Sequence, residues 1–225
     1  MSTPPTTLLV EGPDDKNVIG HLLAQYEFKF DATQILPSSK NTYTHPQYGA
    51  LHIKDIGGID GLIDEVTVQG KLPRLRLGAI ADRDEDNAGQ KDPWPRLKRI
   101  LGSLGFVGIN ELPLEGLVAE GGPGKRIGVW IMPDNSQLGS IESFVGSLVP
   151  KSDALWLRAR SVVSDIPEKQ RLFGKNIAKA EIHTWLAWQA QPGKRMGSAL
   201  GEKLLAHESE PGRTFVDWVI RLMTI

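Results

Sequence analysis

The sequence contains no cysteine. A chain without thiols has no disulfides, no thiolate zinc site and no cysteine nucleophile, and it fits a reducing cytoplasm. Long hydrophobic runs are lacking too, because nowhere do about 18 uncharged apolar residues follow one another. The first seven residues contain no basic segment followed by an apolar one, as a secretion signal would. We therefore expect a cytoplasmic protein that neither spans a membrane nor is exported.

An excess of positive charge is also lacking. The 26 Lys and Arg residues and 27 Asp and Glu residues give a formal net charge of -1, so the chain has no overall basic field of the kind found in proteins that coat nucleic acid. Its basic residues form short clusters, which either contact phosphates or are ordinary solvated surface. These clusters are Arg74 with Arg76, Arg96 with Lys98 and Arg99, Lys125 with Arg126, and residues 169–175.

Short apolar segments alternate with segments of helical periodicity over the first 150 residues. We expect strands at residues 7–10, 51–56, 75–81 and 127–132, each followed by a turn and a helix. Buried strands that alternate with helices are typical of a mostly parallel sheet covered on both faces. The sequence therefore predicts an α/β fold, a Rossmann-like sheet flanked by helices.

The pattern changes in two other regions of the chain. Residues 31–50 are rich in Pro, Ser and Asn and show little periodicity, which indicates a long loop. From residue 151 onward the apolar spacing favours helices, at residues 154–163, 179–189 and 214–223. We therefore predict an α/β domain over residues 5–150 and a helical C-terminal extension over residues 151–225 that packs on it.

Acidic residues follow the ends of the predicted strands. Glu11 ends the first strand, Asp82 and Asp84 end the third, Asp134 ends the fourth, and Glu142 lies in the next helix. Parallel strands place their carboxyl ends at one sheet edge, so these carboxylates are expected to converge. Two like charges about 4 Å apart repel by roughly 4 kcal/mol at an effective dielectric near 20. A cation relieves this repulsion, and all-oxygen ligands favour Mg²⁺ or Mn²⁺.

Helix capping is the alternative role for some of these acids. Asp14 or Asp15 and Asp134 stand where they can accept hydrogen bonds from the free N–H groups of a helix start. Capping does not account for Glu11 or Asp82, each of which ends a hydrophobic strand. The metal hypothesis therefore depends mainly on Glu11, Asp82 and Asp84.

The ordered set of motifs resembles the Toprim domain, which topoisomerases, primases and OLD-family nucleases share. The set consists of Leu-Leu-Val-Glu11-Gly12, the strand that ends in Asp82-x-Asp84, and the following strand and helix with Glu142. The resemblance covers about residues 5–150. It is greatest to small bacterial proteins built around a lone Toprim-like domain, and next to the OLD-family nucleases.

This resemblance implies roles for individual residues. Glu11, Asp82 and Asp84 would hold a metal, with Glu11 and Asp82 also catalytic, and Glu142 looks like an OLD-type ligand for a second ion. Lys179, with Lys175 behind it, would be the lysine that OLD nucleases place after the domain. Because the chain lacks their ATPase domain and the topoisomerase tyrosine module, a separate ATPase or other partner protein is a possibility, as is a homo-oligomer.

Three hypotheses for the function follow. The first is a Mg²⁺-dependent nuclease that acts on DNA or RNA, and the second is a non-catalytic metal- or nucleotide-binding regulatory module of a defence or repair system. The third is a phosphoacceptor or phosphatase site. The third fits less well, because phosphatases of that type carry their acid pair on the first strand.

Overall fold

The computed structural model describes residues 4–33, 40–83 and 92–224. Its described residues form one seven-stranded sheet. In spatial order the strands are β2 (Lys29–Phe30), β3 (Lys40–His45), β4 (Gly49–Asp55), β1 (Thr6–Val10), β5 (Leu75–Asp82), β7 (Lys125–Met132) and β6 (Leu117–Glu120). The four central strands, β4, β1, β5 and β7, run parallel, and the outer strands pair antiparallel with their neighbours. The predicted mostly parallel α/β sheet is confirmed.

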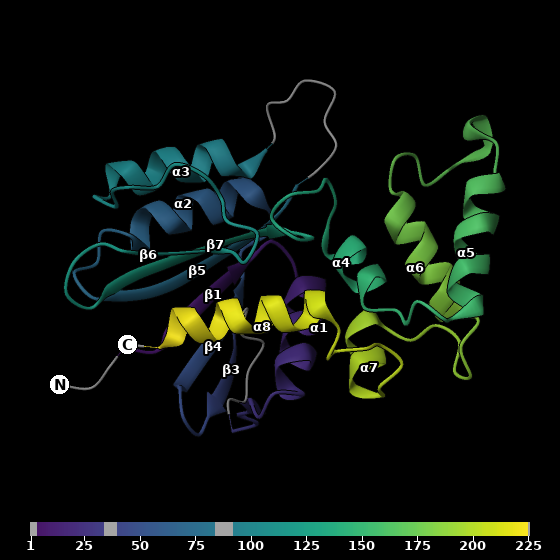
Figure 1. Ribbon diagram of the computed structural model, residues 1–225, viewed down its shortest axis with the longest axis horizontal. Coiled ribbons are helices and arrows are strands. Elements are labelled where there is room, and N and C mark those ends of the chain that lie inside the picture. The colour runs from purple at the N-terminus through teal and green to yellow at the C-terminus, as the bar shows by residue number, and fades with distance from the viewer. Residues whose placement is uncertain (1–3, 34–39, 84–91, 225) are drawn as a thin grey trace.

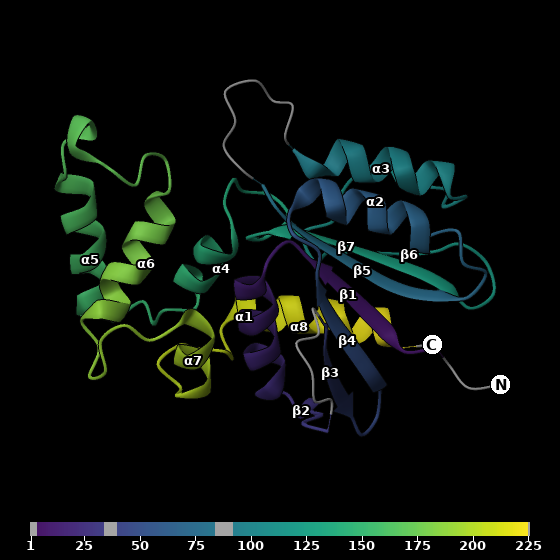
Figure 2. The same ribbon diagram turned by 180° about the vertical axis from the view of Figure 1, so that it is seen from behind.

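Helices cover both faces of the sheet. The helices α1 (Pro13–Ala24) and α8 (Glu210–Met223) lie on one face, and α2 (Ile59–Gln69) and α3 (Pro93–Ser103) lie on the other (Figures 1 and 2). Side chains of β1 alternate between the two cores: Leu8 and Val10 pack with α1 and α8, whereas Leu9 packs with α2 and α3. Burial on both faces explains why the central strands are continuously hydrophobic.

The last helix, α8, packs directly on the sheet. Trp218 lies over Gly78 and Gly128, where an added Cβ would come within 3.2 Å and 3.0 Å of the indole ring. The Trp218 Nε1–H group donates a hydrogen bond to the Leu117 carbonyl over 2.8 Å. Side chains of α8 and of the N-terminal strands therefore share one hydrophobic core.

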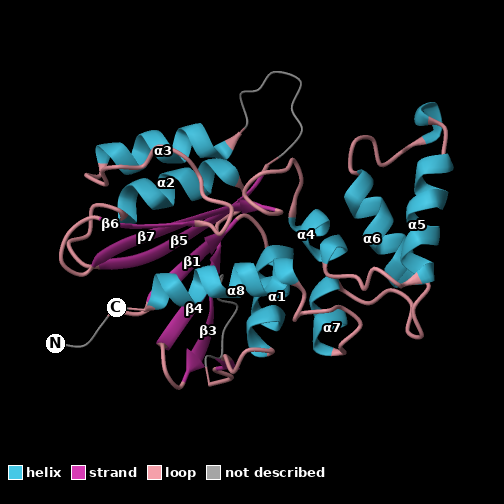
Figure 3. Ribbon diagram, viewed as in Figure 1, coloured by secondary structure: helices cyan, strands magenta, loops and turns pink. Residues whose placement is uncertain are grey.

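The other C-terminal helices extend away from the sheet. They are α4 (Ile141–Ser147), α5 (Ala154–Asp165), α6 (Ile177–Ala187) and α7 (Met196–Gly201), with a short 3₁₀ turn at Glu168–Gln170. Figure 3 shows α5 and α6 side by side beyond α4, while α7 lies beside α1. This arrangement confirms the predicted helical C-terminal segment. None of the helices in the described ranges is long and apolar enough to cross a bilayer.

The prediction of a long loop over residues 31–50 is wrong. This region contains β3, which pairs antiparallel with β4, and the start of β4. Tyr43 of β3 packs so closely on α1 that a Cβ at Gly20 would lie 2.0 Å from its hydroxyl. The strand was missed because its sequence is mostly polar. It is stabilised by pairing with β4, and such pairing leaves no apolar pattern in the sequence of the strand itself. Residues 34–39 lie outside the described part.

Candidate functional site

A cleft of about 720 Å³ lies beyond the carboxyl edge of the sheet, between that edge and the α5–α6 pair. Asp82 and the segment from Leu138 to Ser143 line one side. Arg160 of α5, the start of α6 and Glu181 line the other side. The cleft therefore brings together side chains from the α/β part of the chain and from the helical C-terminal segment.

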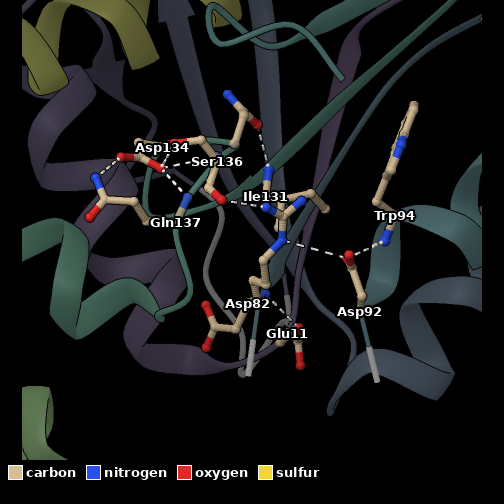
Figure 4. Close-up of polar contacts among 10 residues, drawn as sticks. Glu11, Asp82, Asp92, Trp94, Ile131, Asp134, Ser136 and Gln137 are labelled. Atoms are coloured by element: carbon tan, nitrogen blue, oxygen red, sulfur yellow. Dashed lines mark hydrogen bonds and ion pairs between the residues drawn. The ribbon is translucent and has the colours of Figure 1, made fainter. Parts of the chain in front are cut away.

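Glu11 and Asp82 meet at this edge because they end neighbouring parallel strands. The Glu11 Oε1 atom accepts a hydrogen bond from the backbone N–H of Asp82 over 2.9 Å (Figure 4). The two strands, β1 and β5, pair directly in the sheet. The sequence predicted that these two residues meet at one sheet edge. The hydrogen bond joins the Glu11 side chain to the backbone of Asp82, and binding of a metal by the two carboxylates stays a prediction.

The backbone of Glu11 is held by the loop that follows β4. Its carbonyl accepts hydrogen bonds from the N–H groups of Gly57 and Gly58, over 3.0 Å and 2.9 Å. These residues have φ angles of +82° and +110°, which residues with a Cβ rarely adopt. The Gly57-Gly58 pair is therefore needed for the loop to reach Glu11 in this conformation.

Asp82 is joined to the start of α4. Its Oδ1 atom accepts a hydrogen bond from the Ile141 N–H over 3.1 Å, which is one of the N–H groups left unpaired at a helix start. The next residue along the chain, Arg83, exchanges two backbone hydrogen bonds with Gly139. These contacts hold α4, and with it Glu142, against the end of β5.

Glu142 and Lys179 form an ion pair across the cleft. The Lys179 Nζ atom lies 3.1 Å from Glu142 Oε1, and the Ser140 hydroxyl donates to Glu142 Oε2 over 2.7 Å. Burial of Glu142 acts to raise its pKa, but these two partners and its own backbone N–H outweigh burial and leave the pKa below its ordinary value. The hydrogen bond and the charge of Glu142 in turn raise the pKa of Lys179. Both side chains are therefore charged at neutral pH.

Asp15 is a buried carboxyl beside this group. The helix-capping role predicted for Asp14 or Asp15 is confirmed for Asp15, because its side chain pairs with the backbone of the N-cap residue of α1, Gly12. Asp15 is 7% exposed, and its Oδ2 atom accepts a hydrogen bond from the Gly12 N–H over 3.2 Å. Burial, and then the negative charges of Glu11 and Glu142, raise the pKa of Asp15 to about 7. Its position one helical turn after Glu11 was the signal for a third carboxyl near the site.

Asp134 lies in a local turn. Its Oδ1 atom accepts hydrogen bonds from the N–H groups of Ser136 and Gln137, over 3.0 Å and 2.8 Å, and its Oδ2 atom accepts one from the Gln137 side chain (Figure 4). Burial acts to raise the pKa of Asp134, but these hydrogen bonds lower it overall. Ser136 and Gln137 lie in a turn before α4, whose N-cap is Ser140, so the helix-capping alternative for Asp134 is wrong. Metal binding by Asp134 stays a prediction. Asp84 lies outside the described residues.

The donor chemistry of the site fits a hard divalent cation. Among residues 4–33, 40–83 and 92–224, no three His, Asp or Glu side chains are grouped closely enough to hold a metal by themselves. Mg²⁺ is usually held by one or two carboxylates, with water and substrate phosphate completing its shell. Glu11 and Asp82 each end one of two paired strands, β1 and β5, and the Glu11 carboxylate contacts the backbone rather than the carboxylate of Asp82. With one carboxylate at each strand end, the described residues fit Mg²⁺ better than a metal that needs an all-protein cage.

Comparisons with known proteins assign no activity to this site. Neither the curated proteins nor the solved structures include a match to the chain, and the Toprim resemblance stays a prediction. The model of one family, described as a protein of unknown function (DUF3226), matches residues 5–224. Because this match spans nearly the whole chain, the protein belongs to the DUF3226 family.

Proposed function

We propose that this protein hydrolyses phosphodiester bonds of DNA or RNA in a Mg²⁺- or Mn²⁺-dependent reaction. The observation that carries the proposal is the 2.9 Å hydrogen bond from the Asp82 N–H to Glu11 Oε1, which joins the ends of two neighbouring strands. Asp82 also lines the cleft. The carboxyl ends of neighbouring parallel strands are where such sheets bind their ligands, which supports the assignment of Glu11 and Asp82 to one site. The resemblance to Toprim nucleases supports the same chemistry.

Glu11 and Asp82 would hold the metal, with Asp84 as a further predicted ligand. The bound metal would supply an activated water and neutralise charge on the phosphate. The hydrogen bond from Ile141 orients the Asp82 carboxylate. Lys179, whose side chain is 52% exposed beside Glu142, places a positive charge where negative charge develops on the phosphate oxygens.

The test is cleavage of labelled single-stranded and duplex DNA and RNA by purified protein in Mg²⁺, in Mn²⁺ and in EDTA. We expect cleavage in the two metals and none in EDTA. Asp82→Asn and Glu11→Gln should each lower the rate about 100-fold or more, the size of effect seen when one group that stabilises the transition state is lost. Both variants keep an oxygen that can accept the recorded hydrogen bond.

A matched control separates chemistry from a general loss of charge. Asp64 is an exposed carboxylate on α2, away from the lining of the cleft, so Asp64→Asn should cleave at the wild-type rate. Cleavage by Asp82→Asn at the wild-type rate would refute the assignment of the site. If the wild-type protein binds nucleic acid or metal but cleaves no substrate in either metal, the proposal of hydrolysis fails and the non-catalytic regulatory module takes its place.

A further inference from the structure

The two walls of the cleft carry opposite charges. Asp82 and Glu142 line the wall formed by β5 and α4, and Arg160, Lys175 and Lys179 line the wall formed by α5 and α6. With three cations and one carboxylate, Glu181, the lining of the α5–α6 wall is positive whether or not a metal is bound at the opposite wall. A negatively charged ligand is therefore favoured along the cations.

Arg160 has N–H donors that its ion pair with Glu181 does not use, and these can bind such a ligand. Its Nε atom lies 3.6 Å from Glu181 Oε2, and its side chain is 57% exposed while that of Glu181 is 17% exposed. A guanidinium carries five N–H donors, and two of them can bind one phosphate side by side. Because the ion pair uses Nε, the Nη1 and Nη2 groups can donate to a phosphate in the cleft.

The size of the cleft favours a single strand. A volume of about 720 Å³ lies within the range of roughly 300–1,000 Å³ that encloses a molecule the size of one or two nucleotides. A duplex-binding surface buries about 1,000 Å² or more of protein, so a duplex would have to contact surface beyond the cleft. A single strand, or the unpaired end of a strand, fits.

We propose that Arg160 and Lys175 form a phosphate-binding subsite that holds a single nucleic-acid strand beside the carboxylate site. The inference rests on the proposed function, because the subsite is defined relative to the phosphodiester that would be cleaved near Asp82. Arg160 and Lys175 then bind a neighbouring phosphate of the same strand. The helical C-terminal segment supplies substrate binding, and the sheet edge supplies the reacting groups.

Binding without turnover tests the subsite. Fluorescence anisotropy in EDTA measures the affinity for a labelled 12-nucleotide single strand, as DNA and as RNA, and for a hairpin duplex of the same sequence. We expect the single strand to bind at least 10-fold more tightly than the duplex. Arg160→Gln with Lys175→Gln should weaken single-strand binding at least 10-fold at low salt. It should also reduce the slope of log affinity against log salt by about 1.4, which corresponds to two lost phosphate contacts.

Two further variants control for charge and for packing. Arg158→Gln with Lys169→Gln removes two exposed cations that do not line the cleft, and it should bind the strand as the wild type does. Arg160→Lys with Lys175→Arg keeps both charges and should also retain binding. If it loses binding as completely as the double glutamine variant, the side chains act through packing and the subsite is refuted.

The subsite and the hydrolysis can fail separately. In cleavage assays with Mg²⁺ the double glutamine variant should raise KM with little change in kcat, whereas Asp82→Asn should lose kcat but bind the strand in EDTA as the wild type does. Strand binding that depends on Arg160 and Lys175, without any cleavage, would keep the subsite and remove hydrolysis. Equal affinity of the double glutamine variant and the wild type, or tighter binding of the duplex, would overturn the subsite even if cleavage is observed.

Discussion

Asp15 makes the stability of this protein depend on pH in a direction opposite to that of most carboxylates. Its ordinary pKa of 3.8 rises in the folded state to about 7, first because of burial and then because of the charges of Glu11 and Glu142. Between these two pH values the folded protein keeps a proton that the unfolded chain has released. The contribution of this group to the free energy of unfolding is therefore fully present below about pH 4. It falls by about 1.4 kcal/mol per pH unit as pH rises from there, and it is lost once pH passes 7.

The variant Asp15→Asn isolates this contribution. Asparagine has no titrating proton, and its side-chain oxygen can still accept the hydrogen bond from the Gly12 N–H. Above pH 7 the charged Asp15 costs the wild type about 4 kcal/mol, the free energy that corresponds to the rise in pKa. We therefore expect the variant to gain about 3 kcal/mol relative to the wild type between pH 5 and pH 8.

The assay is urea denaturation of both proteins at several pH values from 5 to 8, in EDTA so that no divalent cation neutralises the neighbouring carboxylates. The difference in unfolding free energy between the two proteins should grow with pH. The same series in Mg²⁺ should show a smaller difference, because a bound cation favours the charged form of Asp15. Unfolding free energies that run parallel across the whole pH range would refute the raised pKa of Asp15.

Two further substitutions test how the site is held and what it needs. Gly58→Ala places a Cβ on a residue with φ of +110° and should cost about 1–3 kcal/mol of stability in urea denaturation. It should also slow cleavage by moving Glu11, and unchanged stability would show that the loop adapts without strain. Lys179→Gln should lower the cleavage rate about 10- to 100-fold through loss of its charge. Lys71, an exposed lysine in the turn after α2 that does not line the cleft, is the control, and Lys71→Gln should have no effect. Equal rates for these two lysine variants would exclude a role for Lys179.

The acids at the strand ends show what a local sequence pattern can predict about contacts between distant segments. Apolar runs that end in Glu11 and Asp82 predicted both the strands and their parallel pairing, because only a strand buried on both faces is continuously hydrophobic. The pairing brings the two residues together, and the Glu11 carboxylate accepts a hydrogen bond from the backbone N–H of Asp82. The same reasoning failed for β3, whose polar sequence carries no comparable signal.

Local sequence patterns were therefore sufficient to predict the α/β class, the helical C-terminal segment and the meeting of the strand ends at Glu11 and Asp82. They did not predict that Asp15 is buried beside these acids, or that Arg160 and Lys179 lie across a cleft from Asp82. The physical reason is that alternation and helical periodicity are properties of neighbouring residues. The burial of a charge, or the distance between two helices, depends instead on how segments far apart in the chain pack together.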